Sequence, residues 1–215
     1  MIAATEAAGW AGMQFFGRTT ASVSHELKNA LAIIKENAGL LNDYLLMMDK
    51  GMPLEPDRLR LVTGRIDQQT QRADDLIRHL NRFGHSVDEK FTSVDLNEVL
   101  ALLAALSARE VSMQQATLNT EVEASPVMVK TTPFWLLTLL GHCLSFALQV
   151  MGPSKDLVVR VTKTEDGGLI RFEQLEKMRQ HPFPGESESA LFEVLGATYR
   201  TEPEKKCMEI KLSNC

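Results

Sequence analysis

Two apolar heptad repeats constrain the N-terminal part of this 215-residue chain more than any other feature. The first repeat alternates spacings of four and three residues and consists of Leu27, Leu31, Ile34, Ala38, Leu41, Leu45 and Met48. The second alternates in the same way and consists of Leu59, Val62, Ile66, Gln69, Ala73, Leu76, Leu80 and Phe83. Spacing of this kind, sustained over about three heptads, predicts two α-helices that each carry an apolar seam.

The segment between the repeats, "DKGMPLEPD" at residues 49–57, is short and rich in residues that end helices. Gly51, Pro53 and Pro56 predict the end of one helix and the start of the next. A short link makes neighbouring helices antiparallel. Because two helices alone bury two such seams poorly, we expect a homodimer that forms a four-helix bundle. The alternative is that the hairpin packs against the C-terminal half of the same chain.

The C-terminal half changes to a mixed pattern of helices and strands after residues 86–93. Asp95 is a candidate N-cap for the first of these helices. The expected elements are a helix at 94–110, a strand at 116–123, a long buried helix at 133–151, a hairpin at 156–175 that turns at Asp166-Gly167-Gly168, a helix at 187–199 and a closing strand at 207–213.

This order predicts the α+β class: an N-terminal antiparallel helical hairpin forming a dimeric four-helix bundle, followed by an α/β-sandwich domain. The expected domains are an N-terminal tail at 1–12, the helical hairpin at 13–90 and the α/β domain at 91–215. Hydrophobic residues make up 44% of the chain, which is enough for a core in each part.

Charge and cysteine content exclude several classes of protein. The net charge is −5 and the pI is about 5.6, so the chain has no basic footprint for nucleic acid. The cysteines, Cys143, Cys207 and Cys215, form no C-x-x-C pair. This pattern argues against a disulfide framework and against a zinc site, and it suits a reducing cytosol.

One segment, residues 131–154, is apolar enough to raise the question of a membrane span. It has no formal charge, but it contains His142 and Gln149, and its clearly apolar part is only about the minimum spanning length. The N-terminus lacks the basic and apolar regions of a signal peptide. We therefore expect a buried core helix, no membrane association and a cytoplasmic location, with any input signal arriving through the cytosol.

Three polar residues stand at the start of the first seam, in "SVSHELKNALAII" at residues 22–34. If Leu27 takes heptad position d, His25 falls at b and Asn29 at f, which face outward and lie one turn apart. Glu26, at c, adjoins them. Such a group suits phosphoryl transfer through a histidine, with the imidazole as nucleophile, the carboxylate holding the ring, and the amide orienting a water or a phosphoryl oxygen. Taken alone, the same residues are typical of a solvated helix face.

The stretch "ASVSHELKNALAIIKENAGLL", followed by a second seam helix and "SVDLNEVL", resembles the dimerisation and histidine-phosphotransfer domain of sensor histidine kinases. "SHELKNALAII" is similar to the H-box of that family. The resemblance implies that His25 is the phospho-acceptor and Glu26 the adjacent acid. The position of Asn29 matches a residue that the family uses to dephosphorylate the partner response regulator.

The C-terminal half resembles the ATP-binding domain of these kinases only in the order of its elements. His142 and Phe146 fall where the family has asparagines, one of which holds Mg²⁺, and a phenylalanine cannot coordinate Mg²⁺. Gln174 stands where an adenine-binding aspartate is expected, and Glu176 where a glycine is expected. The glycine-rich lid is replaced by "HPFPGESESALFEV" at 181–194. The resemblance therefore implies a degenerate domain that kept the fold and lost ATP.

From this we expect a dimeric histidine phosphotransferase that exchanges phosphoryl groups with response-regulator receiver domains through His25. The chain itself would bind no cofactor and no metal, since Mg²⁺ is expected on the receiver. An upstream histidine kinase is a further candidate partner. The alternatives are a sensor kinase with a divergent ATP site, a response-regulator phosphatase in which Asn29 aims a water, and a non-catalytic dimeric scaffold. His79, His85 and His142 are expected to be capping, surface or core residues.

Overall fold

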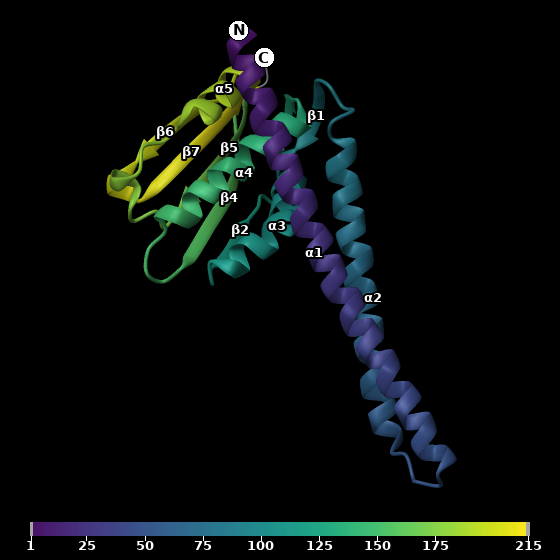
Figure 1. The fold of residues 1–215 in the computed structure, drawn as a ribbon. Coiled ribbons are helices and arrows are strands. Elements are labelled where there is room, and N and C mark those ends of the chain that lie inside the picture. Colours follow the sequence, from purple (N-terminus) through teal and green to yellow (C-terminus); the bar gives the residue numbers. More distant parts are fainter. Residues whose placement is uncertain (1, 214–215) are drawn as a thin grey trace. The chain divides into compact units, whose positions relative to one another are not determined.

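The structure, a computed structural model, describes residues 2–213, so Cys215 lies outside the described residues. Figure 1 shows the fold. The helices are α1 (Ile2–Asp49), α2 (Pro56–His85), α3 (Leu96–Met113), α4 (Pro133–Val150) and α5 (Glu186–Leu195), with short 3₁₀ helices η1 (Met178–Gln180) and η2 (Pro203–Lys205). The strands are β1 (Thr92–Asp95), β2 (Thr117–Glu121), β3 (Met128–Thr131), β4 (Asp156–Thr164), β5 (Gly167–Glu173), β6 (Thr198–Glu202) and β7 (Cys207–Ser213). The predicted α+β class is confirmed.

The chain forms two compact units. The helical unit spans Thr20–Asn81, and the α/β unit combines the start of α1, up to Thr19, with the chain from Arg82 onward. Within the helical unit, α1 and α2 run antiparallel, as the short link predicts (Figure 1). The predicted heptad helices are both present.

Within one chain, only part of the first heptad seam is covered by other residues. Of the seam residues, Leu27, Ile34 and Leu41 are half-buried, whereas the fully buried residues on this part of α1 are Val23, Ala30 and Asn37, which lie beside the predicted seam and not in it. In contrast, Leu31, Leu45 and Met48 expose 58%, 59% and 51% of their surface. The apolar stripe of α1 is therefore wider than the hairpin alone covers.

The α/β unit contains a five-stranded sheet with the order β2-β4-β5-β7-β6. β2 pairs with β4 in parallel, and the other neighbours are antiparallel. Alternate side chains of β4, β5 and β7 form the core, and α3 and α4 lie along that face of the sheet (Figure 1). The buried strand residues include Leu157, Val159, Val161, Ile170, Phe172, Met208, Ile210 and Leu212. A second sheet, β1-β3, is antiparallel.

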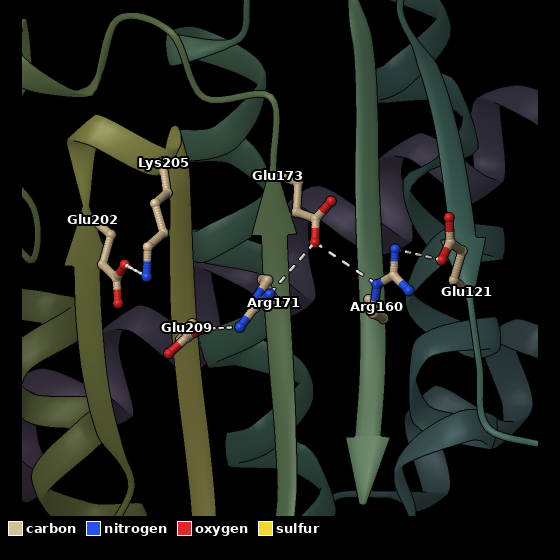
Figure 2. Close-up of polar contacts among 7 residues, drawn as sticks. All are labelled: Glu121, Arg160, Arg171, Glu173, Glu202, Lys205 and Glu209. Carbon is tan, nitrogen blue, oxygen red and sulfur yellow. Dashed lines mark hydrogen bonds and ion pairs between the residues drawn. The ribbon is translucent and has the colours of Figure 1, made fainter.

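The opposite face of the large sheet is covered with charged side chains that pair with one another (Figure 2). Arg160 of β4 contacts Glu121 of β2 at 2.8 Å and Glu173 of β5 at 3.7 Å. Arg171 of β5 pairs with Glu209 of β7. These cross-strand ion pairs balance charge across neighbouring strands, as expected for a face that meets solvent.

Local signals in the sequence explain how α3 and α4 begin. Oδ1 of Asp95 accepts hydrogen bonds from the backbone N–H of Asn97 at 3.0 Å and of Val127 at 2.9 Å, so the predicted N-cap also ties α3 to the segment before β3. Pro133 occupies the first turn of α4, where no backbone donor is needed. α4 is long and apolar enough to cross a membrane, but 72% of it is buried inside the fold, in agreement with the expected core helix.

The structure differs from the predicted tail at residues 1–12. Residues 2–12 belong to α1, and the helix packs on α4 within the α/β unit. A Cβ atom at Gly12 would lie 2.8 Å from the rings of Phe134 and Trp135, and one at Gly141 would lie 2.2 Å from the ring of Phe15. The absence of side chains at these glycines allows the two helices to approach closely.

The predicted helix at 187–199 is too long at its C-terminal end. α5 ends at Leu195, because Gly196 adopts a left-handed conformation with φ of 61° and closes the helix. Tyr199 then belongs to β6 rather than to the helix. The sequence patterns also did not predict the short strands β1 and β3.

Candidate functional site

His25 and Asn29 lie one turn apart on α1 in the helical unit, and both are exposed. The Nδ2 atom of Asn29 is 3.2 Å from Nδ1 of His25. Since residues four apart on a helix are neighbours, the helix itself holds the amide against the imidazole. The structure therefore brings together two of the three candidate site residues.

Glu26 takes a different position from the outward-facing one expected from its heptad position. Its side chain is only 18% exposed, and it forms an ion pair and a hydrogen bond with Arg72 of α2, whose side chain is 52% exposed. The carboxylate is thus directed to the second helix of the hairpin. Arg72 directly precedes Ala73 of the second seam. Its contact with Glu26 was not predicted, because the spacing of apolar residues within one helix does not show which residues of the other helix lie opposite it.

The imidazole of His25 and the amide of Asn29 give this surface a defined chemistry. A neutral imidazole has one nitrogen that donates and one that accepts, and an exposed ring nitrogen with a lone pair is a nucleophile at neutral pH. The carboxamide of Asn29 can contact either kind of nitrogen, through its oxygen or its NH₂ group. The pair suits the capture and release of a group brought by another molecule.

His142, one of the two residues that replace the expected asparagines, forms a pair with Glu188 of α5. Nδ1 of His142 lies 2.6 Å from Oε1 of Glu188, and the two side chains are 12% and 18% exposed. Oε2 of Glu188 accepts a hydrogen bond from the backbone N–H of Gly185 at 2.9 Å. The hydrogen bond from His142 is the main reason that the pKa of Glu188 is lowered, so this carboxylate stays ionised inside the fold.

Phe146, the second of these replacements, packs in a cluster of aromatic rings. Its ring stacks on Phe183 with centroids 4.5 Å apart. Phe183 in turn meets Phe192 of α5 and Tyr199 of β6 edge to face, with centroids 6.4 Å and 6.2 Å apart. The space between α4, α5 and β6 is therefore filled by aromatic side chains from these three elements and from the loop before α5.

Glu176 and Gln174 occupy a tight turn after β5. The side chain of Glu176 lies against Gly152, where an added Cβ would be 2.6 Å from Cδ of the glutamate. Its Oε1 accepts a hydrogen bond from Nζ of Lys206 at 2.9 Å. Gln174 has a positive φ of 71°, and its carbonyl oxygen accepts from the backbone N–H of Gly152 at 3.2 Å. The turn is thus closed by contacts within the chain.

Other groups of potential interest do not add to this site. Within residues 2–213, no group of three or more His, Cys, Asp or Glu is placed to hold a metal ion. The pKa of Cys143 is raised, first by burial and then by the charge of Glu188, so this thiol is poorly reactive. A cavity of about 400 Å³ lies between the ends of α2 and β1 and the starts of α3 and α4, and Arg82, Glu98 and Leu137 are among the residues that line it.

Comparison with known proteins assigns the helical hairpin to a family. Residues 17–86 match the family model described as the His Kinase A (phospho-acceptor) domain. This match contains His25, Glu26 and Asn29, together with Arg72. A search of curated proteins found no match.

Solved structures similar to the chain have low sequence identity. They include the Acinetobacter baumannii histidine kinase AdeS, with 13% identity over 88% of this chain and 97% of that chain and a TM-score of 0.47. A bacterial phosphotransferase has 11% identity over 92% of this chain and 96% of that chain, with a TM-score of 0.49. The histidine kinase ThkA, in complex with the response regulator protein TrrA, has 15% identity over 94% of this chain and 63% of that chain, with a TM-score of 0.47.

Proposed function

Because residues 17–86 form a His Kinase A (phospho-acceptor) domain of the sensor histidine kinase family, we propose that this chain is a dimeric histidine phosphotransferase of two-component signalling. It takes a phosphoryl group from the aspartyl phosphate of one response-regulator receiver domain, carries it on His25 and passes it to another receiver. The protein would act in the cytoplasm, where receiver domains and an upstream histidine kinase would be its partners.

The observation that carries the proposal is the exposed His25 with Asn29 at its Nδ1 atom, inside the matched phospho-acceptor domain. Phosphoryl transfer depends mainly on positioning and on stabilising charge. An exposed imidazole at a fixed place on a rigid helix meets the first need. A receiver domain would supply the second through its own Mg²⁺, so this chain needs no metal or cofactor of its own.

We further propose that the phosphoryl group does not come from ATP bound to this chain. The region between α4 and α5 is filled by the stacked rings of Phe146 and Phe183 and by the half-buried pair of His142 and Glu188. A nucleotide in that region would have to displace these rings and would place its phosphates near the ionised Glu188. Both effects oppose nucleotide binding.

The exposed edge of the α1 seam supports the homodimer. Leu31, Leu45 and Met48 form part of an apolar stripe that a single hairpin leaves uncovered. Two copies related by a two-fold axis would cover each other's stripes and complete a four-helix bundle. In this arrangement each copy keeps its own His25 and Asn29 on the outer surface.

Labelling separates this function from its competitors. The purified protein is incubated with labelled ATP and, separately, with a panel of labelled phosphorylated receiver domains. The His25→Ala variant and the control His85→Ala, which alters an exposed histidine at the end of α2, are treated in the same way. We expect label from a phospho-receiver on the wild type and on His85→Ala, and none on His25→Ala. Label from ATP on His25 would instead establish a kinase and contradict the relay.

A response-regulator phosphatase is the second candidate, and it is favoured by the exposure of Asn29 on the surface that a receiver would meet. In that case His25→Ala would still remove phosphate from a receiver, whereas Asn29→Ala would not. A scaffold without catalysis would itself neither carry nor remove phosphate, and His25→Ala would leave every activity in the signalling pathway intact.

A further inference from the structure

We propose that Arg72 is a positioning residue for phosphoryl transfer at His25, and that it acts through the carboxylate of Glu26. Arg72 forms an ion pair and a hydrogen bond with Glu26. This contact holds the carboxylate toward α2 and compensates its negative charge beside the incoming phosphoryl group. The inference rests on the proposed phosphotransfer and deepens it, because it names the residue of the second helix that prepares the site.

The carboxylate of Glu26 is close enough to the phospho-acceptor for its charge to matter. Glu26 directly follows His25, and consecutive Cα atoms are only about 3.8 Å apart. Asn29, whose Nδ2 atom is 3.2 Å from Nδ1 of His25, follows Glu26 by three residues and lies one turn along the same helix. The separation of carboxylate and imidazole is therefore comparable to the Debye length, about 10 Å at 0.1 M salt, so the two sites are not fully screened from each other.

The ion pair with Arg72 changes the net charge of this turn of α1. The Glu26 side chain is only 18% exposed, so water screens its carboxylate less than that of an exposed acid, and the guanidinium reaches it from α2. With this pair formed, the remaining formal charge among residues 25–29 is that of Lys28, which is exposed and positive. A positive surface attracts an anionic phosphoryl donor. Without Arg72, the charge of Glu26 would cancel that of Lys28.

The transfer step shows why this compensation affects the rate. The lone pair of one ring nitrogen of His25 forms the N–P bond while the P–O bond of the receiver's aspartyl phosphate breaks, and that electron pair remains on the receiver's carboxylate. The proton on the other ring nitrogen stays in place. Negative charge is spread over the phosphoryl oxygens throughout, so an uncompensated carboxylate nearby raises the barrier. The reverse transfer passes through the same charged arrangement, so Arg72 assists both directions.

The test measures how fast phosphoramidate phosphorylates His25 in the full chain. This small anionic donor transfers its phosphoryl group as its P–N bond breaks and the electron pair leaves with ammonia, so no receiver is needed. Label on His25 is identified by its absence from the His25→Ala variant. The second-order rate constant is measured at about 0.01 M and at about 0.5 M salt, which differ strongly in screening. Circular dichroism checks the helix content of each variant.

Four variants separate the charge of Arg72 from its packing. We expect Arg72→Gln to slow labelling about three- to tenfold at low salt, and the difference to shrink at high salt because screening weakens the repulsion. Arg72→Lys keeps the positive charge and should retain most of the wild-type rate. The double variant Glu26→Gln/Arg72→Gln removes both charges and should restore the rate. Arg60→Gln should match the wild type, because Arg60 also pairs with an acid, Asp57, but lies 12 residues before Arg72, about 18 Å along α2.

The outcomes separate this inference from the proposed relay. If Arg72→Gln reacts like the wild type, or is slowed equally at both salt concentrations or in the double variant, Arg72 does not act through the charge of Glu26 and the inference is wrong. A wild-type His25 that phosphoramidate leaves unlabelled is not prepared for transfer, which also contradicts it. If the variants behave as expected but no phosphorylated receiver labels His25, the inference stands and the relay fails.

Discussion

The Nδ1 atom of His142 on α4 lies 2.6 Å from Oε1 of Glu188 on α5, and this pair joins two helices whose residues are 46 positions apart in the chain. Glu188 also caps the start of α5 through the backbone N–H of Gly185. One carboxylate therefore fixes both the beginning of α5 and its attachment to α4. The stability of this junction depends on the charge of that carboxylate.

The first prediction concerns this charge. The pKa of Glu188 is lowered from its usual value of 4.5, mainly by the hydrogen bond with His142. A carboxyl group with a lowered pKa in the folded state stabilises the fold above about pH 4.5, and this contribution is lost as the pH falls through the lowered pKa. We expect Glu188→Gln to reduce the unfolding free energy at neutral pH, with the difference from wild type disappearing in acid.

Thermal unfolding over a range from about pH 3 to pH 7 checks this prediction. Glu186→Gln is the matched control, because Glu186 lies exposed in the same first turn of α5. A difference between Glu188→Gln and wild type that stays constant over the whole range would contradict the prediction.

The second prediction concerns the packing of α1 on α4. Gly141→Ala places a methyl group 2.2 Å from the ring of Phe15, so one helix must shift, and we expect a loss of about 1–3 kcal/mol in unfolding free energy. Gly39→Ala is the control, since nothing lies within 4 Å of that position in α1. It should stabilise the protein by about 0.5–1 kcal/mol through helix propensity.

Denaturant unfolding measures both glycine variants. If the clash with the Phe15 ring is the cause, replacing this ring by a smaller side chain in the double variant Gly141→Ala/Phe15→Leu should recover part of the lost stability. Equal effects of Gly141→Ala and Gly39→Ala would show that the two helices are not in close contact.

The third prediction concerns the ion pair between Glu26 and Arg72, which links α1 to α2 beside the candidate site. Because the Arg72 side chain is half exposed, water screens the pair, and we expect a coupling energy of only about 0.2–1 kcal/mol. A double-mutant cycle with Glu26→Gln and Arg72→Gln, followed by urea unfolding, measures it. The control cycle uses the more exposed pair of Asp75 and Arg78 on α2, which should show a smaller coupling.

The fourth prediction concerns the homodimer. Leu31→Glu introduces a charge into the exposed edge of the α1 seam, and burying it against a second copy would be costly. We expect the dimer dissociation constant to rise at least about tenfold, while the helix content stays the same because Leu31 is exposed in the single chain. Sedimentation or light scattering over a concentration series, with circular dichroism, measures both quantities.

Met113→Glu is the control for the dimer, because Met113 is 71% exposed at the end of α3 in the α/β unit. If Leu31→Glu and Met113→Glu have the same association behaviour as the wild type, the apolar edge of α1 does not form the dimer interface.

The amino-acid sequence by itself determined the two seam helices, the α3 cap at Asp95, the buried α4 and the outward position of His25 and Asn29. Each of these depends on residues within about one or two helical turns, where spacing and side-chain type dictate the local geometry. The contact between Asn29 and His25 belongs to this class, because a separation of four residues brings two side chains together on any helix.

Contacts between distant segments were decided only by the tertiary structure. Spacing along α1 places Glu26 beside His25, but it does not reveal that Arg72, 46 residues later, draws the carboxylate toward α2. The closeness of Gly141 to Phe15, and the stacking of Phe146 on Phe183, likewise depend on which elements meet when the core closes. Such contacts form because burying apolar surface brings those elements together, and that choice is made by the whole chain rather than by any one segment.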